Sequence, residues 1–376
     1  MRKSYIYILL IILMITLVIV NQDNKSKTFK VNGIKYSASL DGNAIDTLPE
    51  KGSYEVEVNC ANATGSWDYN KWVARINNIT GKVSCNISFT TKTSLGINDY
   101  IKGLVGTEQG TGQVVNENGY RYEGKNPNNY IYFNNELWRI IGVFDSSSHG
   151  ITGEYLTKII RNDSLGGYAW DKSNKNNWVT SSLYILLNTN YYNATDGTSS
   201  GKCYQYSTTI TGNCDYTVTG IQSDYRSMVK AVTWYLGGKD STSYTAEAFY
   251  TGERDSTSIY SGNYATISNY IGLMYASDYG YSVLSSNCAR TTKLGSYSTS
   301  ACGGSSWLKN ETTEWTITHR TSSSSNSFAL NNAARLSSPN PYYGDATRPV
   351  LYLKSNVKVY AGDGSISKPY QIMLAS

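Results

Sequence analysis

The clearest pattern of apolar and polar positions lies between Gly119 and Asp145, where apolar runs alternate with turn residues. Tyr130–Phe133 alternates, Asn134-Asn135 follows as a two-residue turn, and Leu137–Phe144 continues as a second run. Asparagine is favoured in the tight turns that join antiparallel strands. A run that is apolar on both faces is typical of a strand inside a sheet. We therefore predict a hairpin whose second strand lies inside the sheet that organises the chain.

The chain after Gly119 continues with helix-like and strand-like segments. Apolar side chains form a broad face in Trp178–Asn190 and in Ile221–Leu236, which we predict to be helices. Lys239–Ser268 is a long polar excursion without periodicity. The further predicted strands are Glu154–Arg161, Tyr270–Leu284, Glu314–Thr318, Phe328–Leu336, Thr347–Leu353, Val357–Tyr360 and Tyr370–Met373. These elements predict an α+β domain over residues 114–376, with mixed antiparallel sheets and two helices.

Residues 28–92 have the pattern of a small all-β domain. Asn32-Gly33 is a strong signal for a hairpin turn, and Tyr54–Cys60 alternates cleanly between apolar and polar residues. Thr93–Gly106 carries an apolar stripe at helical spacing and is followed by a Gly- and Thr-rich link. We therefore predict a helical linker over residues 93–113.

The first residues have the pattern of a membrane-targeting segment. Arg2 and Lys3 precede the apolar run Tyr5–Val20, which as a helix spans about 24 Å, against about 30 Å of hydrocarbon. Basic side chains and interfacial tyrosines close such a gap. We predict an uncleaved single-pass anchor, with a polar spacer completing residues 1–27. A cleaved signal peptide is the alternative, and both place the main body outside the cytoplasm, at the cell membrane.

Composition adds an argument about partners. The 376 residues carry a net charge of +5 without a basic block, so we expect no nucleic-acid partner. Charged residues make up only 16% of the chain, whereas tyrosine occurs 34 times. Tyrosine offers large, rigid contact area with one polar group, and Tyr, Ser, Asn and Gly together are typical of binding loops.

The six cysteines form an even set, for which the sequence alone permits fifteen pairings. Proximity and the predicted domain boundaries favour Cys60–Cys85, Cys203–Cys214 and Cys288–Cys302. Their spacing contains no CxxC pair, so we expect disulfides and no metal site.

Candidate catalytic groups are few. His149 and His319 are the two histidines; either could assist a nucleophile, but we interpret both as exposed loop residues. Glu253-Arg254-Asp255 is an acid/base pair or, as we prefer, a solvated turn, and Asp278 has the setting of a turn residue. We therefore expect no catalytic residue, no cofactor and no enzymatic activity.

Several strings of residues resemble an uncharacterised family of surface proteins from Gram-positive gut bacteria and their wall-less relatives. They are Asn118–Tyr130, Leu137–Phe144, Lys158–Asp163, Ile271–Tyr281 and Arg348–Lys354. The resemblance covers Asn118 to the C-terminal end of the sequence, and the domain with Cys60 and Cys85 looks like one often placed before it. It implies surface display and says little about activity.

The plan of the larger domain more distantly resembles C-type-lectin-like domains, including the formylglycine-generating-enzyme type. The shared features are an opening hairpin, two helices, a long excursion and closing strands near Arg348-Pro349. The copper-binding cysteine pair of that enzyme has no convincing counterpart, because Cys288 and Cys302 flank a loop and look structural. The calcium-binding Glu-Pro-Asn and Trp-Asn-Asp motifs of sugar-binding lectins are also missing.

The lectin-like resemblance implies a ligand site on the late strands and their loops. There we expect the binding residues to be Trp315, Arg320, Arg335, Tyr342 and Tyr343. Some relatives of that fold are variable proteins of diversity-generating retroelements, so varied codons in this region are a further expectation. The predicted function is a membrane-anchored adhesion protein that recognises an extracellular glycan or protein. The alternatives are a surface-coat protein without a specific ligand and an extracellular enzyme of the formylglycine-generating type.

Overall fold

The computed structural model describes residues 29–31, 34–50, 54–69, 71–91, 94–196, 202–206, 208–209, 214–300 and 302–375. The predicted anchor Tyr5–Val20 and its spacer lie outside these residues, so both stay predictions. Within the described ranges, none of the helices combines the length and apolar character needed to cross a membrane.

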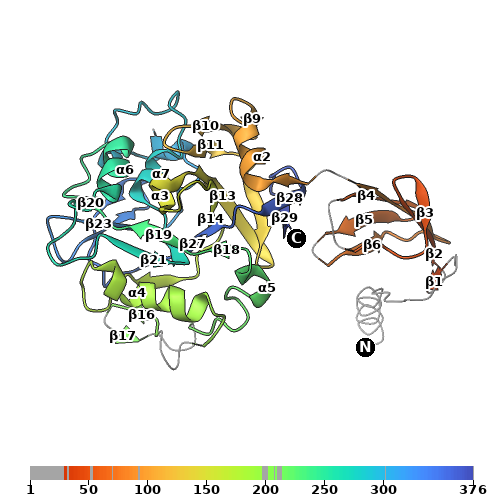
Figure 1. The fold of residues 1–376 in the computed structure, drawn as a ribbon, viewed down its shortest axis with the longest axis horizontal. Coiled ribbons are helices and arrows are strands. Elements are labelled where there is room, and N and C mark those ends of the chain that lie inside the picture. The colour runs from red at the N-terminus through yellow and green to blue at the C-terminus, as the bar shows by residue number, and fades with distance from the viewer. Residues whose placement is uncertain are drawn as a thin grey trace. The chain divides into compact units, whose positions relative to one another are not determined.

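The architecture is mixed, with 15% helix and 38% strand in several sheets. The chain divides into two compact units: Met1–Ser94 with Val359–Ala361, and Leu95–Lys358 with Gly362–Ser376. The described part of the smaller unit consists of strands, whereas the larger unit combines strands with short helices (Figure 1). The α+β prediction is thus confirmed at the level of a mixed, multi-sheet fold.

The smaller unit is built on a five-stranded sheet in the order β1-β2-β7-β4, with β3 beside β2. The predicted hairpin at Asn32-Gly33 is confirmed, because β1 and β2 pair antiparallel with Val31 opposite Ile34; the two turn residues themselves are not described. Strands β2 and β7 pair in parallel. The strands of this unit are β1 (Phe29–Val31), β2 (Ile34–Leu40), β3 (Asn43–Ile45), β4 (Tyr54–Ala61), β5 (Thr64–Asp68), β6 (Val73–Asn77) and β7 (Ser84–Thr91).

The core of the smaller unit is narrow. Val58, Ile87 and Phe89 form a buried apolar cluster, and half-buried aromatic rings pack against them. The Trp67 ring meets the edge of Phe89 with a centroid distance of 5.1 Å. A core of this size provides modest stability, which makes the Cys60 disulfide in the same sheet important.

A twelve-stranded sheet forms the larger unit's main layer, in the order β18-β27-β14-β13-β12-β29-β28-β8. The predicted hairpin is confirmed: β12 and β13 pair antiparallel with Phe133 opposite Glu136. Asn134 and Asn135 both have positive φ, 55° and 61°, as a two-residue hairpin turn requires. The sheet contains β8 (Leu95–Gly96), β9 (Glu108–Gln109), β10 (Thr111–Asn116), β11 (Tyr120–Asn126), β12 (Tyr130–Phe133), β13 (Glu136–Phe144), β14 (Leu156–Arg161), β18 (Val229–Lys230), β22 (Ile271–Gly272), β27 (Val350–Leu353), β28 (Val357–Ala361) and β29 (Tyr370–Leu374).

A six-stranded sheet carries the late strands, in the order β15-β26-β23-β24-β25 with β20 beside β23. The predicted strand Glu314–Thr318 is confirmed as part of β23, while Phe328–Leu336 divides into β24 and β25. The strands are β15 (Gly167–Ala169), β20 (Gly238–Lys239), β23 (Glu314–Arg320), β24 (Ser327–Leu330), β25 (Leu336–Ser337) and β26 (Gly344–Ala346). Two small pairs complete the unit, β16 (Tyr204–Gln205) with β17 (Thr208–Thr209) and β19 (Val232–Tyr235) with β21 (Thr266–Asn269).

The helices of the larger unit are short. The predicted helix Trp178–Asn190 is confirmed as three consecutive helical segments, with Ser181 Oγ accepting from the Tyr184 N–H at the cap. The α-helices are α2 (Ile97–Gly103), α3 (Ser146–His149), α4 (Ser182–Ile185), α5 (Ser223–Arg226), α6 (Ala246–Arg254) and α7 (Ala276–Gly280). The π-helix η2 (Leu186–Tyr191) follows α4, and the 3-10 helices are η1 (Trp178–Thr180), η3 (Leu294–Ser296) and η4 (Cys302–Ser305).

The predicted helix Ile221–Leu236 is wrong. Only Ser223–Arg226 is helical, whereas Val229–Lys230 and Val232–Tyr235 form the strands β18 and β19. Val232 and Trp234 are buried while the residues between and after them are not, which is the two-residue alternation of a strand. β-branched and aromatic side chains favour that conformation.

Two other predicted segments also differ from the structure. The polar excursion Lys239–Ser268 contains α6, capped by Thr245 Oγ1, which accepts from the Ala248 N–H. The predicted strand Tyr270–Leu284 contains only β22 and then α7. In Figure 1, α6 lies beside α7, so the excursion contributes to the packed unit.

Residues 95–113 belong to the larger unit. Ile97 and Ile101 of α2 are completely buried, and β10 pairs with β11 along six residues. The segment predicted as a linker therefore supplies core and sheet residues. The apolar stripe of this segment corresponds to the buried face of α2.

Candidate functional site

Three tyrosine rings from two distant segments meet at the surface of the larger unit. The ring centroids of Tyr342 and Tyr343 are 4.7 Å apart, and Tyr206 lies 5.8 Å from the first and 5.7 Å from the second. Tyr206 is 49% exposed and Tyr343 38% exposed. We call this cluster the tyrosine face. Aromatic groups that stay exposed together form an amphipathic contact surface.

Tyr342 and Tyr343 are held by the connection between β25 and β26. The Pro341 carbonyl accepts from the Asp171 N–H at 3.0 Å, and the Tyr343 N–H donates to the Asn340 carbonyl at 3.1 Å. Pro341 itself is buried. The main chain under the two rings is therefore fixed from both sides, which lowers the entropy lost when a ligand binds.

Tyr206 reaches this surface on a disulfide-bonded loop. It follows β16 inside the loop closed by Cys203 and Cys214. A Cβ atom placed on Gly344 would lie 2.5 Å from Cγ of Gln205, so the absence of a side chain at position 344 lets β16 approach β26. The loop thus brings Tyr206 next to residues that are far away in the sequence.

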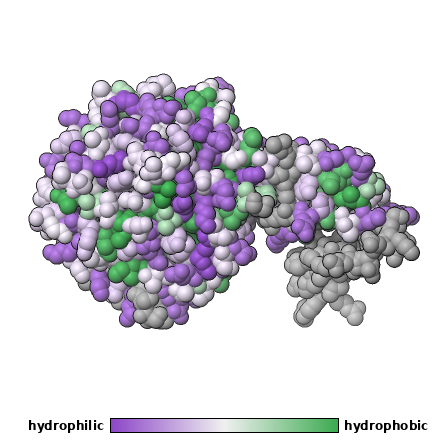
Figure 2. Space-filling view, viewed as in Figure 1, coloured by the Kyte–Doolittle hydropathy of each residue, from purple (hydrophilic) through white to green (hydrophobic). Residues whose placement is uncertain are grey.

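Two charged residues flank the segments that carry the tyrosine face: Lys172, which contacts Tyr204, and Asp345, which lies two residues after Tyr343. Lys172 Nζ is 3.2 Å from Tyr204 Oη and 4.6 Å from the centre of its ring. Burial raises the pKa of Asp345 to about 6. A hydrogen bond to Tyr342 raises the pKa of Tyr343. The contact surface itself thus consists of the three tyrosine rings. On the side of the larger unit seen in Figure 2, small hydrophobic patches are scattered among hydrophilic residues.

The structure separates the residues predicted to bind ligand. Trp315 is 0% exposed and its Nε1 donates to the Tyr168 carbonyl, so its inclusion is corrected: it is a core residue. Arg320 Nε donates to the Asp240 carbonyl at 2.6 Å. Arg335 is exposed. Among the described residues, no hydrogen bond, ion pair or ring contact joins either arginine to the tyrosine face.

Both histidines are buried, which corrects the prediction of exposed loop residues. His149 Nε2 is 3.1 Å from the Phe144 carbonyl, and its Nδ1 accepts from the Ile151 N–H. His319 Nε2 accepts from the Tyr260 N–H at 3.2 Å, and burial lowers the pKa of His319 to about 4. Each imidazole ring is thus hydrogen-bonded to main-chain groups in the interior of the larger unit.

The interpretation of Glu253 as part of a solvated turn is also wrong. Its carboxylate is buried in the last turn of α6, against α7. It accepts from the Ser277 N–H at 3.1 Å, from the Ser277 hydroxyl and from Thr318 Oγ1 at 2.8 Å. Burial raises the pKa of this carboxyl.

Asp278, predicted as a turn residue, is a buried partner of two cations. Asp278 lies in the helix α7 and is buried. Its carboxylate accepts hydrogen bonds from Arg121 Nη1 at 3.0 Å and from Lys158 Nζ at 2.5 Å. These buried charges compensate one another within the unit.

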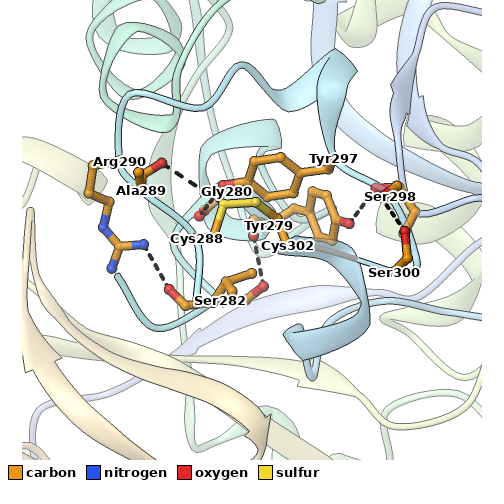
Figure 3. The surroundings of a disulfide bond; sticks show 12 residues. Tyr279, Gly280, Ser282, Cys288, Ala289, Arg290, Tyr297, Ser298, Ser300 and Cys302 are labelled. Atoms are coloured by element: carbon orange, nitrogen blue, oxygen red, sulfur yellow. Dashed lines mark hydrogen bonds between the residues drawn. A yellow bond between two sulfur atoms is a disulfide. The ribbon is translucent and has the colours of Figure 1, made fainter. Parts of the chain in front are cut away.

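All three predicted cysteine pairs are confirmed as disulfides: Cys60–Cys85, Cys203–Cys214 and Cys288–Cys302. Figure 3 shows the third beside the rings of Tyr279 and Tyr297, whose centroids are 5.5 Å apart. Among the described residues, no group of three or more His, Cys, Asp or Glu side chains is placed to hold a metal ion.

Tyr206 is the site residue that sequence reasoning missed. The spacing of Cys203 and Cys214 indicated a closed loop, and the tyrosines inside it were the available signal. Comparison of the chain with protein-family models, with curated proteins and with solved structures gives no match.

Proposed function

We propose that this protein binds an extracellular glycan or protein through the tyrosine face of its larger unit. The observation that carries this proposal is the convergence of Tyr206, Tyr342 and Tyr343 on one surface. Exposed tyrosines on a fixed backbone supply contact area at low entropic cost, and they are frequent hot spots of binding interfaces.

The proposed location is the outer surface of a cell, with residues 5–20 as the membrane anchor. Three disulfides support an oxidising compartment, because such bonds persist mainly in exported proteins. The proposed fold family of the larger unit is C-type-lectin-like. Its late strands and loops carry two of the three tyrosines.

A binding screen tests the proposal. Purified protein lacking residues 1–27 would be applied to arrays of glycans and of cell-surface proteins, beside the double variant Tyr342→Ala/Tyr343→Ala. Truncating aromatic hot spots typically costs about 2 kcal/mol, or about thirtyfold in affinity. We expect a ligand that the double variant binds at least that much more weakly.

Tyr264→Ala is the matched control, because Tyr264 is exposed and, within the described ranges, has no ring contact with the tyrosine face. Equal binding by the double variant and this control would contradict the proposal. A screen without any ligand would favour the coat-protein alternative.

An enzyme of the formylglycine-generating type remains the second alternative. It would require reduced Cys288 and Cys302 at an open site, whereas the two sulfurs are bonded to each other in this structure and both residues are buried. Copper-dependent oxidation of a peptide cysteine by the purified protein would favour that alternative.

A further inference from the structure

A pocket of about 200 Å³ opens where four distant segments of the larger unit meet. Its lining residues are Glu117, Asn118, Glu247, Tyr281 and Arg290. They come from the turn between β10 and β11, the first turn of α6, the end of α7 and the disulfide-closed loop 288–302. This volume is smaller than the roughly 300–1,000 Å³ of pockets for drug-sized ligands. The ligand it admits is therefore small.

Arg290, the only cation among these lining residues, is committed to protein partners. Its Nε donates to Glu117 Oε2 at 2.6 Å, its Nη2 to Glu123 Oε2 at 2.6 Å, and its Nη1 to the Val283 carbonyl at 2.7 Å. Figure 3 shows Arg290 on the loop next to the Cys288 disulfide. The guanidinium is thus fixed and its charge is balanced.

The remaining charge of the pocket is negative. Glu247 is exposed, and no ion pair to it occurs among the described residues. Burial raises the pKa of the Tyr281 phenol, and the carboxylates of Glu247 and Glu117 raise it further, which places both acids near that ring. Glu123 adds no negative charge at neutral pH, because burial raises the pKa of this carboxyl to about 8. A cation entering the pocket would therefore meet the Glu247 carboxylate, whereas the Glu117 carboxylate already shares its charge with Arg290.

We propose that this pocket binds the primary ammonium group of a small ligand. An ammonium has three N–H donors, and the pocket offers three kinds of acceptor. These are the Glu247 carboxylate, Glu117 Oε1 beside the oxygen that Arg290 uses, and the amide oxygen of Asn118. Asn118 Nδ2 donates to Tyr281 Oη at 2.8 Å, which leaves its Oδ1 as an acceptor.

Quaternary ammonium ligands fit this pocket less well. Quaternary ammonium groups are recognised by the faces of several aromatic rings. Here Tyr281 is the single aromatic lining residue, and its ring already lies 4.7 Å from the guanidinium carbon of Arg121 and 5.4 Å from that of Arg290. The ammonium belongs to a short alkylamine, such as a lysine-type side chain, or to an amino sugar.

The test uses the whole 376-residue chain in detergent and titration calorimetry or ligand-observed NMR. The probes are n-butylamine against n-butanol, and glucosamine against glucose, so that the two sources are distinguished. We expect millimolar binding of at least one amine and weaker or absent binding of its neutral counterpart. Butylamine binding would indicate an alkylammonium ligand, and binding of glucosamine alone would indicate an amino sugar.

Glu247→Gln is the decisive variant, because Glu247 is exposed and its replacement leaves the Arg290 pairs intact. Loss of a charge-assisted hydrogen bond should weaken amine binding by about tenfold or more. Glu311→Gln, at an exposed glutamate outside the pocket, should bind as the unmodified chain does. Binding that Glu247→Gln leaves unchanged, equal binding of amine and neutral probes, or no binding of either amine would overturn the proposal. None of these outcomes bears on the tyrosine face.

Discussion

Lys158 and Asp278 form an ion pair in the interior of the larger unit, with Nζ and Oδ2 2.5 Å apart and side chains 1% and 0% exposed. Arg121 and the Tyr275 N–H complete the hydrogen bonding of the carboxylate. Burial alone would raise the pKa of Asp278, but the two cations lower it to about 2. Burial lowers the pKa of Lys158 to about 8 despite the attraction of Asp278. The pair joins β14 to α7.

Removing Asp278 should therefore destabilise the larger unit strongly. Breaking a buried ion pair leaves an uncompensated charge and costs about 3–5 kcal/mol. We expect Asp278→Ala to lower the free energy of unfolding, measured with denaturant, by about that amount. Asp99→Ala is the control, because Asp99 is 78% exposed in its pair with Lys102 and such pairs contribute less than about 1 kcal/mol. Equal effects of the two variants would contradict this account of the core.

Acid should destabilise the protein through His319. Its pKa is about 4 in the folded state, against about 6.5 in an unfolded chain. Between those values the unfolded state binds a proton that the folded state does not. The stability that the neutral His319 ring contributes is therefore fully present above pH 6.5 and is lost as the pH falls toward 4. This difference in pKa changes the free energy of unfolding by about 3 kcal/mol over that pH range. We expect His319→Gln to flatten the rise of unfolding free energy from pH 4 to pH 6.5.

Asp345 provides a control of opposite sign. Its pKa is raised to about 6, so the folded state holds the extra proton and this group lowers stability as the pH rises from about 4 to 6. Asp345→Asn should therefore make the rise steeper, whereas His319→Gln makes it shallower. If unfolding free energy varied with pH in the same way for both variants, the burial of His319 and Asp345 would not have the opposite effects on stability that we predict.

The smaller unit should depend on its disulfide more than on its core. Cys60 and Cys85 are 25 residues apart in sequence and lie opposite each other in β4 and β7. In the chain-entropy model, closing such a loop contributes roughly 3–4 kcal/mol. We expect Cys60→Ser/Cys85→Ser to unfold the smaller unit at lower denaturant concentration, as followed by hydrogen exchange of the backbone amides in β4 and β7. An unchanged midpoint would contradict this expectation.

Sequence patterns predicted the features that depend on neighbouring residues. The hairpin at Asn134-Asn135 follows from turn chemistry, and the pairing of Cys203 with Cys214 follows from proximity. The segment Ile221–Leu236 has apolar residues at helical spacing, but β18 pairs with β27 and β19 pairs with β21, and these distant partners select the strand conformation. Local patterns do not contain that information.

The candidate site and the buried charges depend on distant contacts. Asp278 has the sequence setting of a turn residue, and its partners Arg121 and Lys158 are more than a hundred residues away. Trp315 was predicted at the surface because exposure cannot be read from one side chain. Tyr342 and Tyr343 were predicted, but Tyr206 meets them only through contacts between distant segments.

The most direct test of the account is the affinity of the array-identified ligand for the variant Tyr206→Ala, measured beside the unmodified protein and the control Tyr264→Ala. Tyr206 belongs to the proposed site only because the structure brings it to Tyr342 and Tyr343. If the three rings bind as one surface, Tyr206→Ala should raise Kd by about thirtyfold, with Tyr264→Ala unchanged. A Kd for Tyr206→Ala equal to that of the unmodified protein would contradict the proposed tyrosine face.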